Sequence, residues 1–161
     1  MCGRGLLLYG PAGTYKTTTA AAILLHAVRR GLMNTDPTDR NITWHGWAMG
    51  RFVDWQEVSE LFRSANDDEA DDFDATEIRK ALIPTGPTLN RADYLVLDDI
   101  SRERATEWNT SELQRIIRRR GDNGYPTIVT TNTTPKEWES IHGEPLTDFF
   151  DRSFVHVEIG L

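Results

Sequence analysis

The chain has 161 residues, of which 39% are hydrophobic and 27% charged, and its formal net charge at pH 7 is −7. This composition is typical of one water-soluble globular domain with a sizeable core, which we predict over residues 1–161. No apolar run approaches the roughly 18 residues of a membrane span, no signal-peptide pattern is visible, and the single Cys2 excludes an internal disulfide, so we expect a cytoplasmic protein without membrane contact.

The first patterned stretch is GLLLYGPAGTYKTTT at 5–19. The apolar run Leu6–Tyr9 predicts a buried strand, and the alanine-rich segment Thr17–Arg30 predicts a helix capped by Gly31. A glycine-containing turn connects the two. This order of strand, turn and helix is typical of a phosphate-binding loop, where backbone N–H groups and a helix N-terminus converge on an anion.

The loop matches GxxxxGK[ST] at every specified position but one, because Tyr15 stands where the last glycine is expected. We expect the backbone N–H groups of 12–17 and the Lys16 ammonium to bind phosphate, and the Thr17 hydroxyl to bind Mg²⁺. A positive φ at Tyr15 would cost about 1–2 kcal/mol, which is tolerable if its ring points outward. The predicted nucleotide-binding residues are Gly10, Pro11, Ala12, Gly13, Thr14, Tyr15, Lys16, Thr17 and Thr18.

The next segments are less regular. ITWHGWA at 42–48 has strand character, whereas Phe52–Ala65 repeats apolar residues at a helical period. A short helix is predicted over Glu77–Ile83.

Most of the negative charge is concentrated in one segment. Seven acidic residues and no basic one lie between Asp67 and Glu77, so the rest of the chain is close to neutral. We expect an exposed loop over Asn66–Asp74, which is either a solvated insertion or a surface for a basic partner.

The apolar run Tyr94–Leu97 predicts another buried strand, and it ends in Asp98 and Asp99. Mg²⁺ held with nucleotide phosphates usually takes one or two protein carboxylates. Asp98 is therefore the expected metal ligand, and Asp99 would orient or deprotonate an attacking water. The alternative is a turn with two solvated aspartates.

The last part of the chain continues the alternation of helices and strands. Helices are predicted over Ser111–Arg120 and Pro135–Ile141, and strands over Thr127–Thr131 and Phe154–Ile159. We therefore expect an α/β fold with a mostly parallel five-stranded sheet. Ligands of such sheets bind at the carboxyl ends of the strands, where residues 10–17, 98–99 and Asn132 would gather. Asn132 alone could equally begin a turn.

Four segments in this order, GPAGTYKT, LVLDD, PTIVTTNTTPKEW and FFDRSF, resemble the AAA+ ATPases of the DnaC/IstB type. These are the replicative-helicase loaders of bacteria and phages and the ATPase helpers of insertion-sequence transposases. The resemblance runs from Gly5 to about Ile159. It implies a P-loop NTPase three-layer sandwich. The chain departs from the family pattern in two places, because we expect neither the N-terminal partner-binding domain of the helicase loaders nor a C-terminal helical lid in it.

The resemblance also assigns catalytic roles. Asp98 takes the place of the Walker B aspartate, Asp99 stands where many AAA+ proteins carry the catalytic glutamate, and Asn132 is sensor I. Arg152 falls at the arginine that reaches the γ-phosphate in a neighbouring subunit, so homo-oligomers are implied. The alternative for Arg152 is a plain surface residue.

By this resemblance we expect an ATP- and Mg²⁺-binding ATPase that acts on a replicative DNA helicase and single-stranded DNA. A transposition helper ATPase, a nucleotide-dependent binding module without hydrolysis and a small P-loop kinase are the alternatives. A basic cluster on one predicted helix is a candidate nucleic-acid contact, alternatively a solvated helix face, and Trp44 and Trp47 are candidate stacking residues, alternatively core. The cluster comprises Arg115, Arg118, Arg119 and Arg120.

Overall fold

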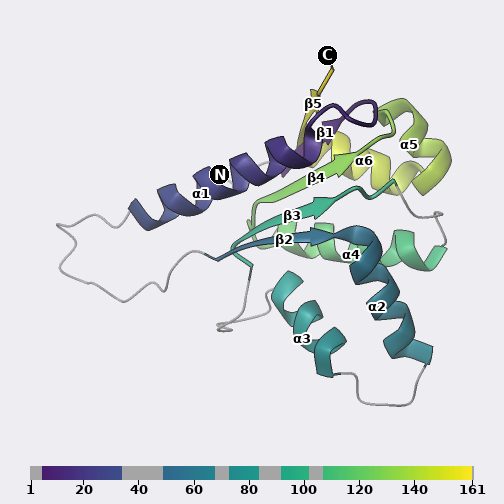
Figure 1. Ribbon diagram of the computed structural model, residues 1–161. Helices are drawn as coiled ribbons and strands as arrows, with labels where there is room; N and C mark the ends of the chain where they lie inside the picture. Colours follow the sequence, from purple (N-terminus) through teal and green to yellow (C-terminus); the bar gives the residue numbers. More distant parts are fainter. Residues whose placement is uncertain (1–4, 34–48, 68–72, 84–91, 102–106, 161) are drawn as a thin grey trace.

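The computed structural model describes residues 5–33, 49–67, 73–83, 92–101 and 107–160, which form a five-stranded sheet with helices on both faces (Figure 1). The strands are β1 (Gly5–Tyr9), β2 (Gly50–Asp54), β3 (Tyr94–Asp98), β4 (Thr127–Thr131) and β5 (Phe154–Glu158). The helices are α1 (Lys16–Met33), α2 (Trp55–Asp67), α3 (Phe73–Leu82), α4 (Glu107–Asp122), α5 (Pro135–His142) and α6 (Glu144–Ser153).

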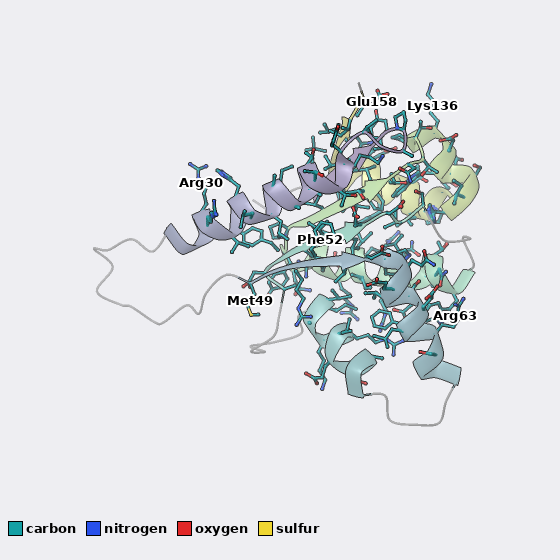
Figure 2. The ribbon with its side chains drawn as sticks, in the orientation of Figure 1. Arg30, Met49, Phe52, Arg63, Lys136 and Glu158 are labelled. Carbon is teal, nitrogen blue, oxygen red and sulfur yellow. The ribbon has the colours of Figure 1, made fainter. Side chains whose placement is uncertain are left out.

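The sheet has the strand order β2-β3-β4-β1-β5, and every pairing in it is parallel. The carboxyl ends of all the strands therefore meet at one edge. Tyr9 at the end of β1 is in register with Thr131 of β4 and with Glu158 of β5, which is labelled in Figure 2. The predicted α/β fold with a mostly parallel five-stranded sheet is confirmed.

Side chains fill the space on both faces of the sheet (Figure 2). Successive residues of a strand point to opposite faces, and Leu7 and Leu8 accordingly belong to two different hydrophobic clusters. Leu8 packs with Ala20 of α1, whereas Leu7 belongs to the larger cluster under α2, α4, α5 and α6. Two helical layers thus enclose the sheet, as the predicted sandwich requires.

The start of the second strand differs from the sequence prediction. Residues 52–54, expected to begin a helix, belong to strand β2, which pairs with β3. The helix starts only at Trp55, because the Asp54 carboxylate accepts hydrogen bonds from the backbone N–H groups of Gln56 and Glu57 at 2.8 and 3.4 Å and so caps α2. The strand expected at 42–48 lies outside the described residues.

Three helix predictions also need correction. Helix α1 continues to Met33 and therefore passes through Gly31, which is not its cap. The loop expected over Asn66–Asp74 is wrong at both ends, because α2 extends to Asp67 and α3 already begins at Phe73; residues 68–72 lie outside the described residues. Helix α6 was not predicted at all. Gly143, with φ +80°, separates it from α5.

In the part of the chain that the structure describes, no helix combines the length and the apolar character needed to cross a membrane.

Candidate nucleotide-binding site

The loop between β1 and α1 has the backbone conformation of an anion cradle. Gly13 and Tyr15 both have positive φ, at 82° and 62°. Gly10 has φ 147°, and a β-carbon at this position would lie 2.2 Å from the Ile159 carbonyl oxygen, so only glycine fits. Tyr15 is 69% exposed. The position does take a positive φ, and the residue is mostly exposed, as the sequence analysis required for a non-glycine residue here.

Lys16 lies under this loop, and its side chain is buried. Its ammonium donates hydrogen bonds to the carbonyl oxygens of Gly10 and Pro11 at 2.8 and 2.6 Å. Burial lowers the pKa of Lys16, while the charges of Asp99 and Asp98 raise it and so oppose this effect. A positive charge is thus fixed at the floor of the loop, close to both aspartates.

The first residue pair across the site is Thr17 and Asp98. The Thr17 hydroxyl donates to the two carboxylate oxygens of Asp98 at 3.1 and 3.0 Å, although the residues are 81 positions apart. Thr130 of β4 donates a second hydroxyl to Asp98 at 2.6 Å. Asp98 is buried, so these hydroxyls replace the water that an exposed carboxylate would have.

The second pair is Asp99 and Asn132. The Asn132 side-chain amide donates to Asp99 Oδ1 at 3.1 Å, and the Ser101 hydroxyl donates to the same oxygen at 3.0 Å. Asp99 has a positive φ of 52°. The two neighbouring aspartates therefore have separate partners.

These groups surround a cavity of about 410 Å³ at the carboxyl edge of the sheet, lined by residues 12–17, Asp99, Thr130 and Asn132. The convergence predicted from the sequence is thus observed. The sequence analysis missed Thr130 and Ser101. Thr130 could have been found from its position two residues before Asn132, since such residues share a face of a strand.

The donor set fits Mg²⁺. The metal prefers oxygen ligands and keeps several waters, so it needs one or two protein carboxylates. Thr17 and Asp98 supply adjacent oxygens at the edge of the cavity. Among the described residues there is no group of three or more His, Cys, Asp or Glu side chains that could hold a metal.

Arg152 lies away from this cavity. It comes just before β5, whose first residue, Phe154, is in register with Gly5 at the start of β1, whereas the phosphate loop follows the end of β1. A strand of five residues spans roughly 16 Å at about 3.3 Å per residue. The side chain is 75% exposed and pairs with Asp148 at 2.6 Å. Within one chain, Arg152 therefore stays at the opposite edge of the sheet from the cavity.

The basic cluster of α4 is divided by the structure. Arg115, Arg118 and Arg119 are exposed, with Arg115 paired to Glu112 at 2.9 Å. Arg120 is fully buried, so its predicted contact with nucleic acid is wrong. Trp44 and Trp47 lie outside the described residues.

Arg120 has a structural role. Its guanidinium donates to backbone carbonyls at the carboxyl end of α3 and just before the first residues of β3 and β4. Burial lowers the pKa of Arg120 to about 10, and the charges of Tyr125 and Asp93 oppose this effect. The acceptors are the carbonyl oxygens of Leu82, Ala92, Asp93 and Pro126 and the Thr127 hydroxyl.

Comparison with known proteins supports the resemblance seen in the motifs. No protein-family model matches the chain. A curated protein of Mycobacterium tuberculosis (strain ATCC 25618 / H37Rv), named as a putative ATP-binding protein in an insertion sequence, is 26% identical over 144 residues. The match covers 89% of this chain and 47% of that protein, so the chain spans about half the length of this relative.

Solved structures of replication proteins share the fold. The DnaC helicase loader aligns with a TM-score of 0.73 and 23% identity over 99% of this chain and 80% of its own. DnaI aligns with a TM-score of 0.66 and 20% identity over 99% of this chain and 74% of its own. The replication initiator DnaA bound to AMPPCP and single-stranded DNA aligns with a TM-score of 0.71 and 18% identity over 98% of this chain and 40% of its own. The predicted resemblance to the DnaC/IstB type and the P-loop NTPase fold are confirmed.

Proposed function

We propose that this chain binds ATP with Mg²⁺ in the cavity at the carboxyl edge of the sheet and hydrolyses it. The observation that carries the proposal is the pair of hydrogen bonds that the Thr17 hydroxyl, directly after the phosphate loop, donates to the Asp98 carboxylate. It joins the two oxygen ligands that a nucleotide-bound Mg²⁺ takes from a P-loop protein. The buried Lys16 ammonium beside them supplies the positive charge that phosphates require.

In this proposal the loop residues bind the phosphates. The backbone N–H groups of 12–17 and the N-terminus of α1 bind the phosphate oxygens, and Lys16 moves its hydrogen bonds from the loop carbonyls to the β- and γ-phosphates. Thr17 and Asp98 would hold Mg²⁺, and the bound metal would supply positive charge that offsets the charge developing on the phosphates during hydrolysis.

The catalytic residues of the proposal are Asp99, Asn132, Lys16 and Arg152. Asp99 accepts a hydrogen bond from the attacking water and orients it, and the Asn132 amide fixes the Asp99 carboxylate. Arg152 of one subunit reaches the γ-phosphate of another, because it lies at the opposite edge of the sheet from its own cavity. Hydrolysis then requires assembly.

The proposed setting is DNA replication, with a replicative helicase and single-stranded DNA as partners. The fold of the DnaC helicase loader over 99% of this chain supports it. Arg115, Arg118 and Arg119 are the exposed candidates for DNA contact. A transposition helper ATPase is the second candidate, because the curated relative is named after an insertion sequence.

Two measurements on one set of variants test the proposal. Binding is measured with a fluorescent ATP analogue, with and without Mg²⁺, and turnover as phosphate release with and without single-stranded DNA. We expect Lys16→Ala to abolish binding and Asp99→Asn to bind ATP but lose turnover. The matched control Lys80→Ala removes an exposed lysine on α3 whose ammonium pairs with Glu77 at 2.9 Å, and it should change neither.

The results separate the alternatives. Binding without turnover in the wild-type protein would exclude an ATPase and leave a nucleotide-dependent binding module. No binding by the wild-type protein would refute the proposed site. Capture of a purified replicative helicase, rather than a purified transposase, would favour the loader function.

A further inference from the structure

The adjacent carboxylates of Asp98 and Asp99 are held by different hydroxyl groups. Thr130 donates to Asp98 and accepts from the backbone N–H of Asp99, at 2.6 and 2.8 Å. Ser101 donates to Asp99 Oδ1 at 3.0 Å and accepts from the backbone N–H of Asn132 at 2.9 Å. Each hydroxyl thus uses both its donor and its acceptor capacity inside the site.

Ser101 completes a closed set of hydrogen bonds with Asp99 and Asn132. The Asn132 amide donates to the same Asp99 oxygen that accepts from Ser101, while the Asn132 backbone donates to Ser101. The Asp99 carboxylate and Asn132, which contacts it, are therefore both hydrogen-bonded to the Ser101 side chain. Loss of the Ser101 hydroxyl would remove one of the two hydrogen bonds that Asp99 Oδ1 accepts from Ser101 and Asn132, and so would loosen the terminal torsion of the carboxylate.

The hydroxyl of Ser101 is not needed to keep β3 and β4 together. The chain just after β3 is already joined to β4 by the Ile100 N–H, which donates to the Thr130 carbonyl at 3.1 Å. The Asp99 N–H adds a second link to β4 through the Thr130 hydroxyl. What Ser101 adds is an orientation of side chains, namely the direction of the Asp99 carboxylate and the place of Asn132.

We propose that Ser101 is a positioning residue for hydrolysis, which holds the Asp99 carboxylate and Asn132 in the geometry that orients the attacking water. The inference rests on the proposed ATPase function and assigns a role to a residue outside the motifs. It predicts that Ser101 affects turnover and not nucleotide binding, because its hydroxyl bonds to Asp99 and to the Asn132 backbone, the residues assigned to the attacking water.

Kinetics of two variants test this role. We expect Ser101→Ala to lower kcat by about tenfold to a hundredfold, the factor for a lost hydrogen bond to a charged group, with KM and the affinity for the ATP analogue unchanged. Ser101→Thr keeps the hydroxyl and should recover most of the rate. The control Ser64→Ala removes an exposed hydroxyl that donates to the Leu61 carbonyl on α2 and should leave kcat unchanged.

A readout that does not depend on activity is amide hydrogen exchange at Asn132, whose N–H bonds to Ser101. Exchange should accelerate in Ser101→Ala and not in Ser101→Thr or Ser64→Ala. An unchanged kcat in Ser101→Ala, or a loss of binding and rate together that Ser101→Thr fails to recover, would overturn the inference. If the wild-type protein binds ATP without turnover, the proposed hydrolysis fails, and unchanged exchange at Asn132 would then overturn the inference as well.

Discussion

Tyr15 holds a backbone conformation that favours glycine, and its replacement by glycine should stabilise the fold. Its φ is 62°, and its ring is 69% exposed. A non-glycine residue in the left-handed region costs about 1–2 kcal/mol. Glycine gains more conformational freedom in the unfolded chain, which subtracts roughly 0.4–1 kcal/mol. The expected net effect of Tyr15→Gly is a stabilisation of between about 0 and 1.6 kcal/mol, centred near 0.8 kcal/mol.

The control for this prediction is Tyr15→Ala, which removes the ring and keeps the β-carbon that causes the strain. Since the ring is mostly exposed, we expect Tyr15→Ala to change the stability by less than about 0.5 kcal/mol. The pair of variants therefore separates the contribution of the backbone from that of the ring.

Thermal and urea unfolding measure both variants. Extrapolated free energies carry an uncertainty of about 10–15%, so midpoints are compared, with the m-values checked for equality. For a domain of this size, about 1 kcal/mol shifts the thermal midpoint by roughly 2–4 °C. A midpoint of Tyr15→Gly equal to or below that of Tyr15→Ala would refute the argument from strain.

Three further predictions follow from single side chains. Arg120→Met removes the donor to several buried carbonyls and should lower the free energy of unfolding in urea by on the order of 3 kcal/mol. The control Arg119→Met, at an exposed neighbour, should lower it by less than about 0.5 kcal/mol. Equal losses in the two variants would contradict the structural role of Arg120. The Arg152→Ala and Lys16→Ala proteins should each lack turnover alone but recover part of it when mixed, because the first keeps an intact nucleotide site and the second keeps the arginine. If the mixture shows no recovery of phosphate release, Arg152 does not act between subunits. Burial lowers the pKa of His142 from 6.5, so the unfolded chain binds the proton more tightly and the free energy of unfolding should fall as pH drops below about 6.5. His142→Gln should remove this part of the pH dependence, and an unchanged pH profile in thermal unfolding would refute it.

The sequence predicted the site better than the fold around it, for a physical reason. Each site motif directly follows a short buried strand, as Asp98 and Asp99 follow Tyr94–Leu97. In a parallel sheet all such ends meet at one edge. The order of segments alone was therefore enough to bring the loop, the aspartates and Asn132 together.

The sequence prediction of the fold was wrong where one pattern of apolar residues is compatible with both a helix and a strand. Apolar residues recur from Phe52 onward at a helical period, yet Phe52 belongs to the edge strand β2, where its side chain is 40% exposed. The signal for the true helix start was Asp54, a capping residue directly before Trp55.

Arg120 shows that charge alone does not predict exposure. It was grouped with its basic neighbours because of its type. Its position, however, follows the buried residues Leu113, Ile116 and Ile117 at the spacing of one helix face. The helical period thus contained the information that this arginine points into the protein.

The positions of the cavity and of Arg152 restrict how subunits could assemble under the proposed mechanism. The cavity lies beyond the end of β1, and Arg152 lies beside its start. A contact that brings Arg152 of one subunit to the cavity of another therefore joins opposite edges of the sheet. It leaves the cavity of the first subunit and Arg152 of the second free for further neighbours. Such a head-to-tail contact is heterologous, so it produces a ring if the rotation closes and a helical filament if it does not. A two-fold dimer would join the same surface of both subunits. It would complete both sites only if that surface contained the cavity as well as Arg152, so that each arginine enters the cavity of its partner.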